Sequence, residues 1–343
     1  MFQLVTICEL SNPGSAPRCN STQNLTSPFD LPPKEPPVQT TLQHDVTFAG
    51  TGLHTGQPAA VVLHPARAGH GIVFRRTDVT DRDAAVPARW DHVIVSTLNT
   101  RIENFAGVSV STIEHLMAAL AGCGVHNALI DIDGPEVPIL DGSAADFVRG
   151  IIGAGLAELD APLWAIEVLK TVMATQGDAY ARLSPARTLH IDFTIDFTDA
   201  AIGHQAKKLN MANGTFVREL CDSRTFCRQA DVARMQAEGK ALGGTLLNAV
   251  VIDGDTVLSP GGLRHEDEAV RHKMLDALGD LNTAAAPILG RYTGHKAGHA
   301  LTNQLLRALF TTPGAWRLVQ CDAGIAARLP GASLHLADLA LVA

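Results

Sequence analysis

Apolar residues recur along the chain in short strand-like runs and longer helix-like patterns, separated by turns rich in glycine, proline and aspartate. Up to residue 162, these patterns predict strands at 45–48, 59–63 and 128–132 and helices at 113–120 and 144–154. The strand at 128–132 ends at Asp133-Gly134-Pro135, a combination typical of turns. The first part of the chain is therefore expected to mix strands and helices.

After residue 162 the pattern begins again. Strands are predicted at 164–169 and 188–197, a hairpin at 250–252 and 256–258, and helices at 266–281 and 300–309. Residues 188–197 alternate with a period of two, which is typical of a strand that buries one face. Because turns join most strands, antiparallel pairing is favoured over a doubly wound parallel sheet. We expect an α+β fold with two domains, 38–162 and 163–343, in agreement with a length of 343 residues.

Residues 1–37 differ from the rest of the chain in composition. They hold seven of the 18 prolines, mixed with serine, asparagine and threonine. Proline lacks a backbone donor, and a polar, proline-rich segment has too few apolar side chains to build a core. We expect this segment to be a disordered N-terminal tail.

Composition narrows the classes of function. The net charge of -8 argues against broad binding to nucleic acid, which depends on a basic surface. No run approaches the ~20 apolar residues of a transmembrane helix, and the N-terminus lacks the features of a signal peptide. The six cysteines form no Cys-x-x-Cys pair, so a reduced, cytoplasmic protein is expected.

Ser111-Thr-Ile-Glu114-His115 opens the first predicted helix and has two interpretations. Ser111 and Glu114 have the spacing of a capping box, in which both side chains satisfy free N–H groups at the helix start. Alternatively, His115 binds a metal ion while Glu114 acts on the water beside it, and the helix dipole favours the ionised carboxylate. The local pattern by itself favours the capping box.

The helix predicted at 266–281 carries two stripes of side chains. One stripe is apolar and typical of a packed helix, and it consists of Val270, Met274, Ala277, Leu278 and Leu281. His272, Asp276 and Asp280 recur every four residues and share the other face. That face could be a solvated polar surface. Alternatively, His272 and Asp276 bind one metal ion, a third ligand comes from elsewhere, and a fourth position stays open for water.

Gly294-His-Lys-Ala-Gly-His299 lies just before the last predicted helix. Its two histidines could be unrelated surface residues. Flexible glycines beside His299 would also suit a side chain that must approach a substrate closely. Taken singly, none of these three segments decides the function.

The order and wording of the motifs are more informative than any one of them. The motifs are, in chain order, Gly52-Leu-His-Thr-Gly56, Ser111-Thr-Ile-Glu-His115, Pro138-Ile-Leu-Asp-Gly-Ser143, Asp192-Phe-Thr-Ile-Asp-Phe197, Arg224-Thr-Phe226, Glu266-x-x-x-Val-Arg-His-Lys-Met-Leu-Asp-Ala-Leu-Gly-Asp280 and Gly298-His-Ala-Leu301. From about residue 40 to the C-terminus, the chain resembles the UDP-3-O-acyl-N-acetylglucosamine deacetylases, zinc hydrolases that commit a sugar nucleotide to lipid A synthesis. The run that ends at Asp280 is especially specific.

This resemblance implies a two-domain α+β sandwich, in which helices pack between mainly antiparallel sheets and the active site lies where the domains meet. It implies one zinc ion, or ferrous iron in vivo, held by His115, His272 and Asp276. Glu114 would be the general base. His299 would be the general acid or an electrostatic stabiliser, oriented by Asp280.

The resemblance also implies where the substrate, an acylated UDP-sugar, would bind. Thr225 would donate a hydrogen bond to the carbonyl oxygen that becomes negatively charged. The residues expected along the rest of the substrate are Lys273 and Lys296 at the diphosphate, Phe226 and Asp231 at the glucosamine, and Leu98 at the edge of the site. Residues 228–251 would form an insert that lines a passage for the acyl chain. We expect a monomer.

Two other functions stay open at this point. The same ligands could serve a metal hydrolase that acts on another N-acyl substrate. Alternatively, the chain could be a sugar-nucleotide or lipid-binding protein that kept the fold without the activity. Glu114, Thr225 and His299 together argue against a binding protein, because such a protein needs no base, oxyanion donor and acid.

Overall fold

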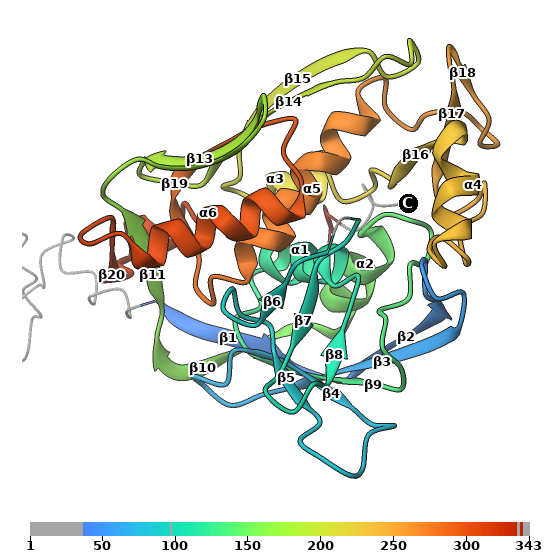
Figure 1. The fold of residues 1–343 in the computed structure, drawn as a ribbon. Helices are drawn as coiled ribbons and strands as arrows, with labels where there is room; N and C mark the ends of the chain where they lie inside the picture. The colour runs from blue at the N-terminus through green and yellow to red at the C-terminus, as the bar shows by residue number, and fades with distance from the viewer. Residues whose placement is uncertain (1–36, 97, 335–336, 339–343) are drawn as a thin grey trace, which may run out of the picture. The chain divides into compact units, whose positions relative to one another are not determined.

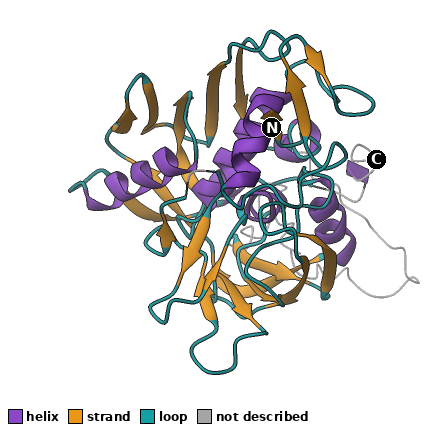
Figure 2. Cartoon of the chain, turned by 45° about the vertical axis from the view of Figure 1, so that its right-hand side comes forward, coloured by secondary structure: helices purple, strands orange, loops and turns teal. Residues whose placement is uncertain are grey.

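The structure of the protein is a computed structural model that describes residues 37–96, 98–334 and 337–338. The predicted N-terminal tail, residues 1–37, lies outside the described residues apart from Pro37. Each segment that the sequence pattern predicts overlaps an observed element of the same type, but the described chain also holds many strands and short helices that the pattern did not predict (Figure 2).

Before residue 163, the main sheet has the strand order β2-β3-β9-β4-β5. These strands span Val46–Thr51 (β2), Pro58–Pro65 (β3), Ile72–Arg76 (β4), Ala85–Pro87 (β5) and Ala128–Ile132 (β9). Neighbouring strands are antiparallel except β4 and β9, which are parallel. Alternate residues of β3 and β9 are buried, so the sheet turns one face toward the core.

Two smaller groups of strands complete this part of the chain. β1 (Val38–Leu42) pairs antiparallel with β10 (Leu156–Pro162). The short strands β6 (Val93–Ile94), β7 (Arg101–Glu103) and β8 (Ser109–Val110) form an antiparallel meander. This meander leads into the first helix, and the loop before β7 ends in the buried residues Asn99 and Thr100.

After residue 163, the main sheet has the order β12-β13-β19-β11-β20, and β14 joins it beside β19 and pairs with β15. Its strands are Trp164–Val168 (β11), Val172–Gln176 (β12), Ala179–Pro185 (β13), His190–Asp196 (β14), His204–Asn210 (β15), Ile288–His295 (β19) and Trp316–Gln320 (β20). Neighbours are antiparallel except that β19 is parallel to both β11 and β14. A smaller sheet consists of β16 (Phe226–Arg228), β17 (Val250–Asp253) and β18 (Thr256–Val257), and β17 and β18 form the predicted hairpin.

The longer helices form the layer between the two main sheets (Figure 1). The longer ones are α1 (Glu114–Cys123), α2 (Ala145–Ala154), α5 (Glu268–Asn282) and α6 (His299–Thr311), and the shorter ones are α3 (Thr215–Glu219), α4 (Gln229–Ala237) and α7 (Ala323–Ala326). α2 packs on β2, α5 and α6 pack on the second sheet, and α1 packs on α2 and α5. The predicted α+β sandwich, with helices between mainly antiparallel sheets, is therefore confirmed.

The division of this sandwich into domains at residue 162 stays a prediction. It falls at the junction where β10 ends at Pro162 and β11 begins at Trp164. The predicted insert, residues 228–251, contains α4 and the segment that leads into β17.

The helices α1 and α5 form the centre of the middle layer. α1 is buried along almost its whole length, with Leu116, Met117 and Leu120 inaccessible to solvent. The two helices approach each other closely at Gly279, where an added Cβ would come closer than 3.0 Å to the carbonyl oxygen of Glu114. Glycine permits this close approach of two backbones. As a result, the first turn of α1 lies against the middle of α5.

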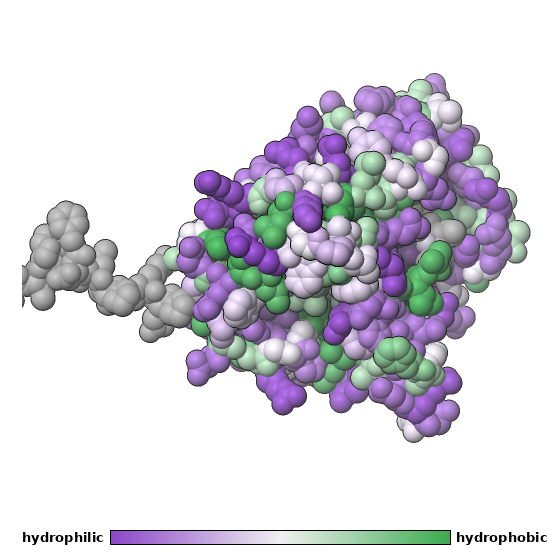
Figure 3. All heavy atoms as spheres, turned by 60° about the vertical axis from the view of Figure 1, so that its left-hand side comes forward, coloured by the Kyte–Doolittle hydropathy of each residue, from purple (hydrophilic) through white to green (hydrophobic). Residues whose placement is uncertain are grey.

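Among the described residues, no helix combines the length and the apolar content that crossing a membrane requires. On the face drawn in Figure 3, hydrophobic residues form small patches between hydrophilic ones. Scattered apolar surface residues of this kind are usual and carry no function by themselves.

Candidate active site

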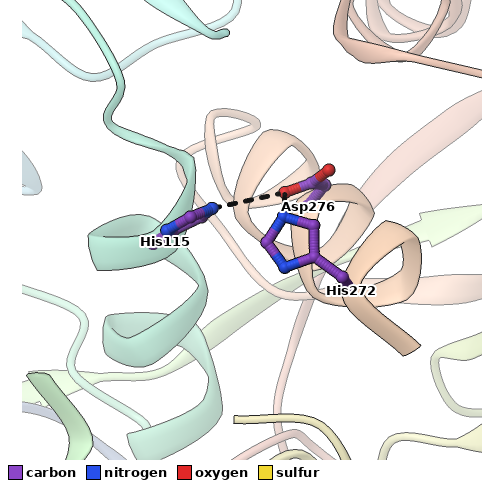
Figure 4. Close-up of side chains that lie close together, drawn as sticks. All are labelled: His115, His272 and Asp276. Atoms are coloured by element: carbon purple, nitrogen blue, oxygen red, sulfur yellow. Dashed lines mark ion pairs between the residues drawn. The ribbon is translucent and has the colours of Figure 1, made fainter. Parts of the chain in front are cut away.

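The helices α1 and α5 bring together the three side chains predicted as metal ligands (Figure 4). His115 lies in the first turn of α1, and His272 and Asp276 lie one turn apart on α5. Nε2 of His115 is 3.7 Å from Oδ1 of Asp276, and Nε2 of His272 is 3.3 Å from the same oxygen. One potential ligand atom from each residue lies within 4.8 Å of the others. The cluster is compact enough to hold one metal ion.

The capping-box interpretation of Ser111 and Glu114 is wrong. The hydroxyl of Ser111 donates to the carbonyl oxygen of Pro135 at 3.1 Å, and no side chain caps α1. The reason is the backbone: Thr112 has a φ of 57°, in the left-handed region, while a bridge to Glu136 holds Ser111 extended. The Ser111 hydroxyl therefore points away from the helix, and Glu114 is free to take other partners.

The solvated interpretation of the polar stripe on α5 is also wrong. The exposed fractions of His272, Asp276 and Asp280 are 3%, 5% and 4%. α1 covers one part of this stripe, and His299 at the start of α6 covers another. Elements distant in sequence thus bury a face that the local pattern made ambiguous.

The donors around the cluster fit a divalent metal ion. Oδ2 of Asp276 accepts a hydrogen bond from Nζ of Lys273 at 2.7 Å, whereas Oδ1 is buried without a hydrogen-bond partner. An unpaired buried carboxylate oxygen is costly unless a cation compensates it. Nδ1 of His272 donates to the carbonyl oxygen of Ser223 at 3.0 Å, which leaves the lone pair of Nε2 facing Asp276. Two imidazole nitrogens and one carboxylate oxygen form a donor set typical of zinc.

The ionisation states of the three residues also suit metal binding. Burial, together with His272, lowers the pKa of His115 to about 3, and burial lowers the pKa of His272 as well. Burial opposes ionisation of Asp276, but His272 and Lys273 outweigh it and hold the pKa of Asp276 below its usual range. Metal binding needs neutral histidines and an ionised carboxylate. The cluster offers both near neutral pH.

Glu114 lies beside the cluster and contributes no atom to it. Its Oε2 accepts the backbone N–H of Thr100 at 2.9 Å, and its Oε1 is 3.8 Å from Nε2 of His299. Burial raises the pKa of Glu114 to about 7, with the charge of His299 opposing this shift. A carboxylate with a pKa near the working pH is suited to act as a general base.

His299 and Asp280 form a buried pair across α6 and α5. Nδ1 of His299 donates to Oδ2 of Asp280 at 2.9 Å, and Nε2 lies 3.9 Å from Oδ2 of Asp276. Burial by itself would lower the pKa of His299, but Asp280 and Glu114 outweigh it and raise the pKa to about 9. The imidazole is therefore cationic near neutral pH and can donate a proton or stabilise negative charge.

Thr100 is a residue of this site that the sequence analysis missed. Its backbone N–H binds Glu114, and its hydroxyl donates to Oδ1 of Asp280 at 2.5 Å. Thr100 lies in the loop before β7, with no motif around it. A lone threonine in a loop gives no signal that could have singled it out.

Phe226 packs beside the candidate metal ligands, and Thr225 directly precedes it in the chain. The Phe226 ring packs edge-on against the His272 ring, with 6.3 Å between their centroids. Thr225 directly precedes β16, where its N–H donates to the carbonyl oxygen of Gly142 at 2.8 Å and its own carbonyl accepts the N–H of Val250 at 2.7 Å. Both backbone bonds hold the start of β16 in place beside α5.

The other predicted substrate residues have varied surroundings. Lys273 is half-buried and bonds Asp276, while Leu98 is exposed two positions before Thr100. Lys296 pairs with Asp178 and Asp196 at 2.9 and 3.3 Å. Asp231 on α4 pairs with Arg228 and Arg234 at 3.7 and 2.7 Å. The proposed contacts of these four side chains with substrate stay predictions.

The predicted insert packs against the glycine-rich turn near residue 54. The N–H of Leu242 donates to the carbonyl oxygen of His54 at 3.2 Å, and that of Gly243 donates to Leu53 at 3.0 Å. Several apolar side chains of the insert are exposed, with Leu247 at 74%. The insert thus presents apolar surface next to a turn that precedes β3.

A cavity of about 390 Å³ lies at the other end of the α1–α5 pair. Its lining includes Ala121 of α1 and Leu278 and Leu281 of α5, and none of the predicted site residues. The polar cluster, and not this cavity, therefore marks the candidate active site.

Comparison with known proteins agrees with this geometry. A family model for UDP-3-O-acyl N-acetylglycosamine deacetylase matches residues 39–311. This chain belongs to that family. The deacetylase of Phenylobacterium zucineum (strain HLK1) is 49% identical over 280 residues, which cover 82% of this chain and 96% of that protein.

Two other relatives match this chain over nearly their whole length. The UDP-3-O-acyl-N-acetylglucosamine deacetylase of Shewanella frigidimarina (strain NCIMB 400) is 42% identical over 87% of this chain and 99% of that protein. That of Shewanella oneidensis is 42% identical over 85% of this chain and 97% of that protein. The resemblance drawn from the motifs is thereby confirmed at the level of the family.

Proposed function

We propose that the protein is a zinc-dependent hydrolase that removes the N-acetyl group of UDP-3-O-acyl-N-acetylglucosamine, the committed step of lipid A synthesis. The observation that carries this proposal is the buried cluster of His115, His272 and Asp276, with the Glu114 carboxylate and the His299 imidazole directly beside it. The names of the relatives indicate the same substrate for those proteins.

His115, His272 and Asp276 would hold the metal ion. The chemistry that zinc supplies when bound is that of a Lewis acid, which activates water and polarises an amide carbonyl near neutral pH. Three protein ligands leave one position open, as in catalytic zinc sites. Ferrous iron could take the same place in vivo.

Glu114 accepts the proton of the attacking water in this proposal. Its Oε1 is the available oxygen, because Oε2 already accepts the N–H of Thr100. The hydroxyl of the water joins the acetyl carbon, and the bond from that carbon to nitrogen then breaks. Water is consumed, and acetate and a free amine are the products.

The nitrogen must gain a proton before it leaves, since an amide anion is too basic to be released. Nε2 of His299 donates this proton, or the imidazolium stabilises the charge while Glu114 returns the proton it took. Nε2 lies 3.8 Å from Oε1 of Glu114, so the two groups can serve the same substrate atoms. Thr225 donates a hydrogen bond to the carbonyl oxygen as it becomes negative, a contribution of about 3–4 kcal/mol for a well-placed donor.

The remaining substrate groups are assigned to the predicted residues. Lys273 and Lys296 bind the diphosphate, Phe226 and Asp231 border the glucosamine, and Leu98 lies at the edge of the site. The insert at 228–251 lines the acyl-chain passage, in agreement with its exposed leucines. A monomer in the cytoplasm is the expected form of the enzyme.

Two measurements on the purified protein test this function. We expect one equivalent of zinc by metal analysis, and release of acetate from UDP-3-O-acyl-N-acetylglucosamine. Bound metal without acetate release would indicate a hydrolase for another N-acyl substrate. Absence of both would indicate a binding protein that kept the fold.

A further inference from the structure

Thr100 lies where three elements of the site meet. It is 3% exposed and precedes β7, while its partners are on α1, α5 and at the start of α6. Two of these partners are distant in sequence, because 180 residues separate Thr100 from Asp280 and 199 separate it from His299. Its contacts therefore come entirely from the tertiary fold.

The backbone and the side chain of Thr100 have separate partners. The N–H donates to Oε2 of Glu114 at 2.9 Å, and the hydroxyl donates to Oδ1 of Asp280 at 2.5 Å. The hydroxyl oxygen is also 3.2 Å from Nδ1 of His299. Thr100 thus contacts Glu114, the proposed base, His299, the proposed acid, and the Asp280 carboxylate that binds His299.

The hydroxyl determines how Asp280 can hold His299. Nδ1 of His299 lies 2.9 Å from Oδ2 and 3.1 Å from Oδ1 of Asp280, and the Thr100 hydroxyl, at 2.5 Å, is the closer donor to Oδ1 in this buried place. With the Thr100 hydroxyl on Oδ1, both oxygens are satisfied and the carboxylate plane is held. The His299 ring is then held with Nε2 toward Glu114 and Asp276.

We propose that Thr100 is a positioning residue for the reaction: it holds the Asp280–His299 pair in register with Glu114. The proposal rests on the proposed function, in which Glu114 and His299 handle protons at the same substrate. Proton transfer is sensitive to geometry, and a misplacement of about 1 Å can reduce the rate about 100-fold. Thr100 is not one of the proposed metal ligands, and its side chain contacts Asp280 and His299, so we expect its effect to pass through those side chains.

Two variants of Thr100 distinguish the effect of its hydroxyl from the effect of its side-chain size. Thr100→Val keeps the size and the backbone N–H and removes only the hydroxyl, whereas Thr100→Ser keeps the hydroxyl. We expect Thr100→Val to lower kcat by roughly 10- to 100-fold with KM within about twofold of wild type, because ground-state binding is untouched. Thr100→Ser should restore most of kcat. The metal content of both variants should equal that of wild type.

Thr41→Val is the matched control. Thr41 is 4% exposed, and its hydroxyl donates to the carbonyl oxygen of Asn127 and accepts the N–H of Ala66, both at 2.8 Å. Its partners belong to the first part of the chain and not to the site. Thr41→Val should therefore lose stability comparable to that of Thr100→Val while its kcat stays near that of wild type.

A spectroscopic readout makes the test independent of turnover. The Nδ1 proton of a histidine bonded to a carboxylate gives a strongly downfield proton NMR signal, which His299→Ala would assign by removing it. We expect this signal to shift or broaden in Thr100→Val and to persist in Thr100→Ser and Thr41→Val. If the wild type released no acetate, the proposed function would fail, and this signal alone would decide the role of Thr100.

Three results would overturn the proposal. The first is a normal kcat in Thr100→Val. The second is a kcat in Thr100→Ser as low as in Thr100→Val, which would indicate that the methyl group and not the hydroxyl matters. The third is an unchanged downfield signal in Thr100→Val.

Discussion

The two faces of α5 are both buried, but they differ in chemical character and in what their burial does to stability. One face carries Val270, Met274 and Leu278, which pack in the apolar core. The other carries His272, Asp276 and Asp280, which are 3–5% exposed. Burial of the apolar face stabilises the fold. Burial of the polar face costs hydration free energy, and this cost is offset only where protein partners replace the hydrogen bonds to water.

The polar face is incompletely compensated. Most polar atoms of this face have a hydrogen-bond partner, supplied by Lys273, Ser223, Thr100 or His299. Oδ1 of Asp276 is buried without one. Protein stability alone would favour apolar residues at such positions. The difference between the faces indicates that one was shaped by packing and the other by chemistry that needs an unpaired oxygen and neutral imidazoles.

The largest effects are expected from substitutions at Glu114 and His272, and they should distinguish the proposed general base from the proposed metal ligands. Glu114→Ala should lower kcat by roughly 10²- to 10⁴-fold, the range for general acid–base groups, and keep its metal. His272→Ala should lose both metal and activity, because it removes one of the three protein ligands. Metal analysis and acetate release measure the two properties on the same samples. Equal metal loss in Glu114→Ala would show that this division of roles is wrong.

Met274→Ala is the control from the apolar face. Met274 is inaccessible to solvent, and replacing a buried methionine by alanine typically costs about 2–5 kcal/mol of stability. Its metal content and the kcat of the folded fraction should stay close to those of wild type. If Met274→Ala lost metal as His272→Ala does, the two faces would not be functionally distinct.

Removal of the metal should weaken the whole fold. A ligand that binds only the folded state at about 1,000 times its Kd stabilises that state by about 4 kcal/mol. A chelator should therefore lower the free energy of unfolding of the wild type in urea titrations. His272→Ala, which holds no metal at the site, should unfold at the same urea concentration with and without the chelator. A wild type insensitive to the chelator would contradict a stabilising metal centre.

Gly279 sets the distance between the two helices that supply the proposed metal ligands. A Cβ there would come closer than 3.0 Å to the Glu114 carbonyl oxygen, so Gly279→Ala must move α1 and α5 apart by roughly 1 Å to regain ordinary contact. Metal ligands tolerate deviations of only about 0.2 Å. We expect metal affinity to fall by about 10- to 100-fold, a loss typical of disturbed ligand support, in a competition titration with a chelating dye.

Gly122→Ala provides the comparison for this substitution. Gly122 is also on α1, and its added Cβ would come closer than 3.0 Å to the ring of Phe216, away from the ligands. Both variants should be destabilised, but only Gly279→Ala should lose metal affinity. The same loss in both would mean that general destabilisation, and not helix spacing, weakens the site.

The sequence predicted the fold class, and periodicity together with the family resemblance pointed to the three candidate ligands that the structure brings together. His272 and Asp276 are four residues apart, so any helix places them on one face, and the apolar stripe opposite predicts that helix. The motif order then connects His115 to them. The local pattern could not predict that the polar stripe is buried, because the helices that cover it, α1 and α6, are distant from it in sequence.

Thr100, Thr112 and Gly279 show why other parts of the site could not be predicted. Thr100 acts through contacts spanning up to 199 residues, and its residue type is ordinary in a loop. The capping box failed at Thr112, whose left-handed backbone breaks the local geometry that the spacing of Ser111 and Glu114 assumes. Gly279 lies in the middle of a helix, where its absent side chain matters only because another helix backbone lies against it.

The smallest expected effect is a shift of the pH profile, and it tests the polar face most directly. Glu114 must be ionised, so activity should rise as pH increases through its pKa, which burial raises to about 7. His299 must be protonated, so activity should fall as pH increases through its pKa, which Asp280 and Glu114 raise to about 9 against the effect of burial. The profile of kcat/KM should be bell-shaped, and its limbs are apparent values of a coupled site.

Asp280→Asn removes the negative charge that favours the His299 cation and preserves the shape of the side chain. The pKa of His299 should fall, and the alkaline limb should therefore move to lower pH, while the acid limb moves less. A bound metal ion lowers the pKa of both groups in wild type and variant alike, so the direction of the change is preserved. We expect the kcat loss at the new optimum to be less than about tenfold, smaller than for His299→Ala, because the imidazole is still present. An alkaline limb that does not move in Asp280→Asn would mean that Asp280 does not control His299, and that Glu114 alone must deliver the proton to the leaving amine.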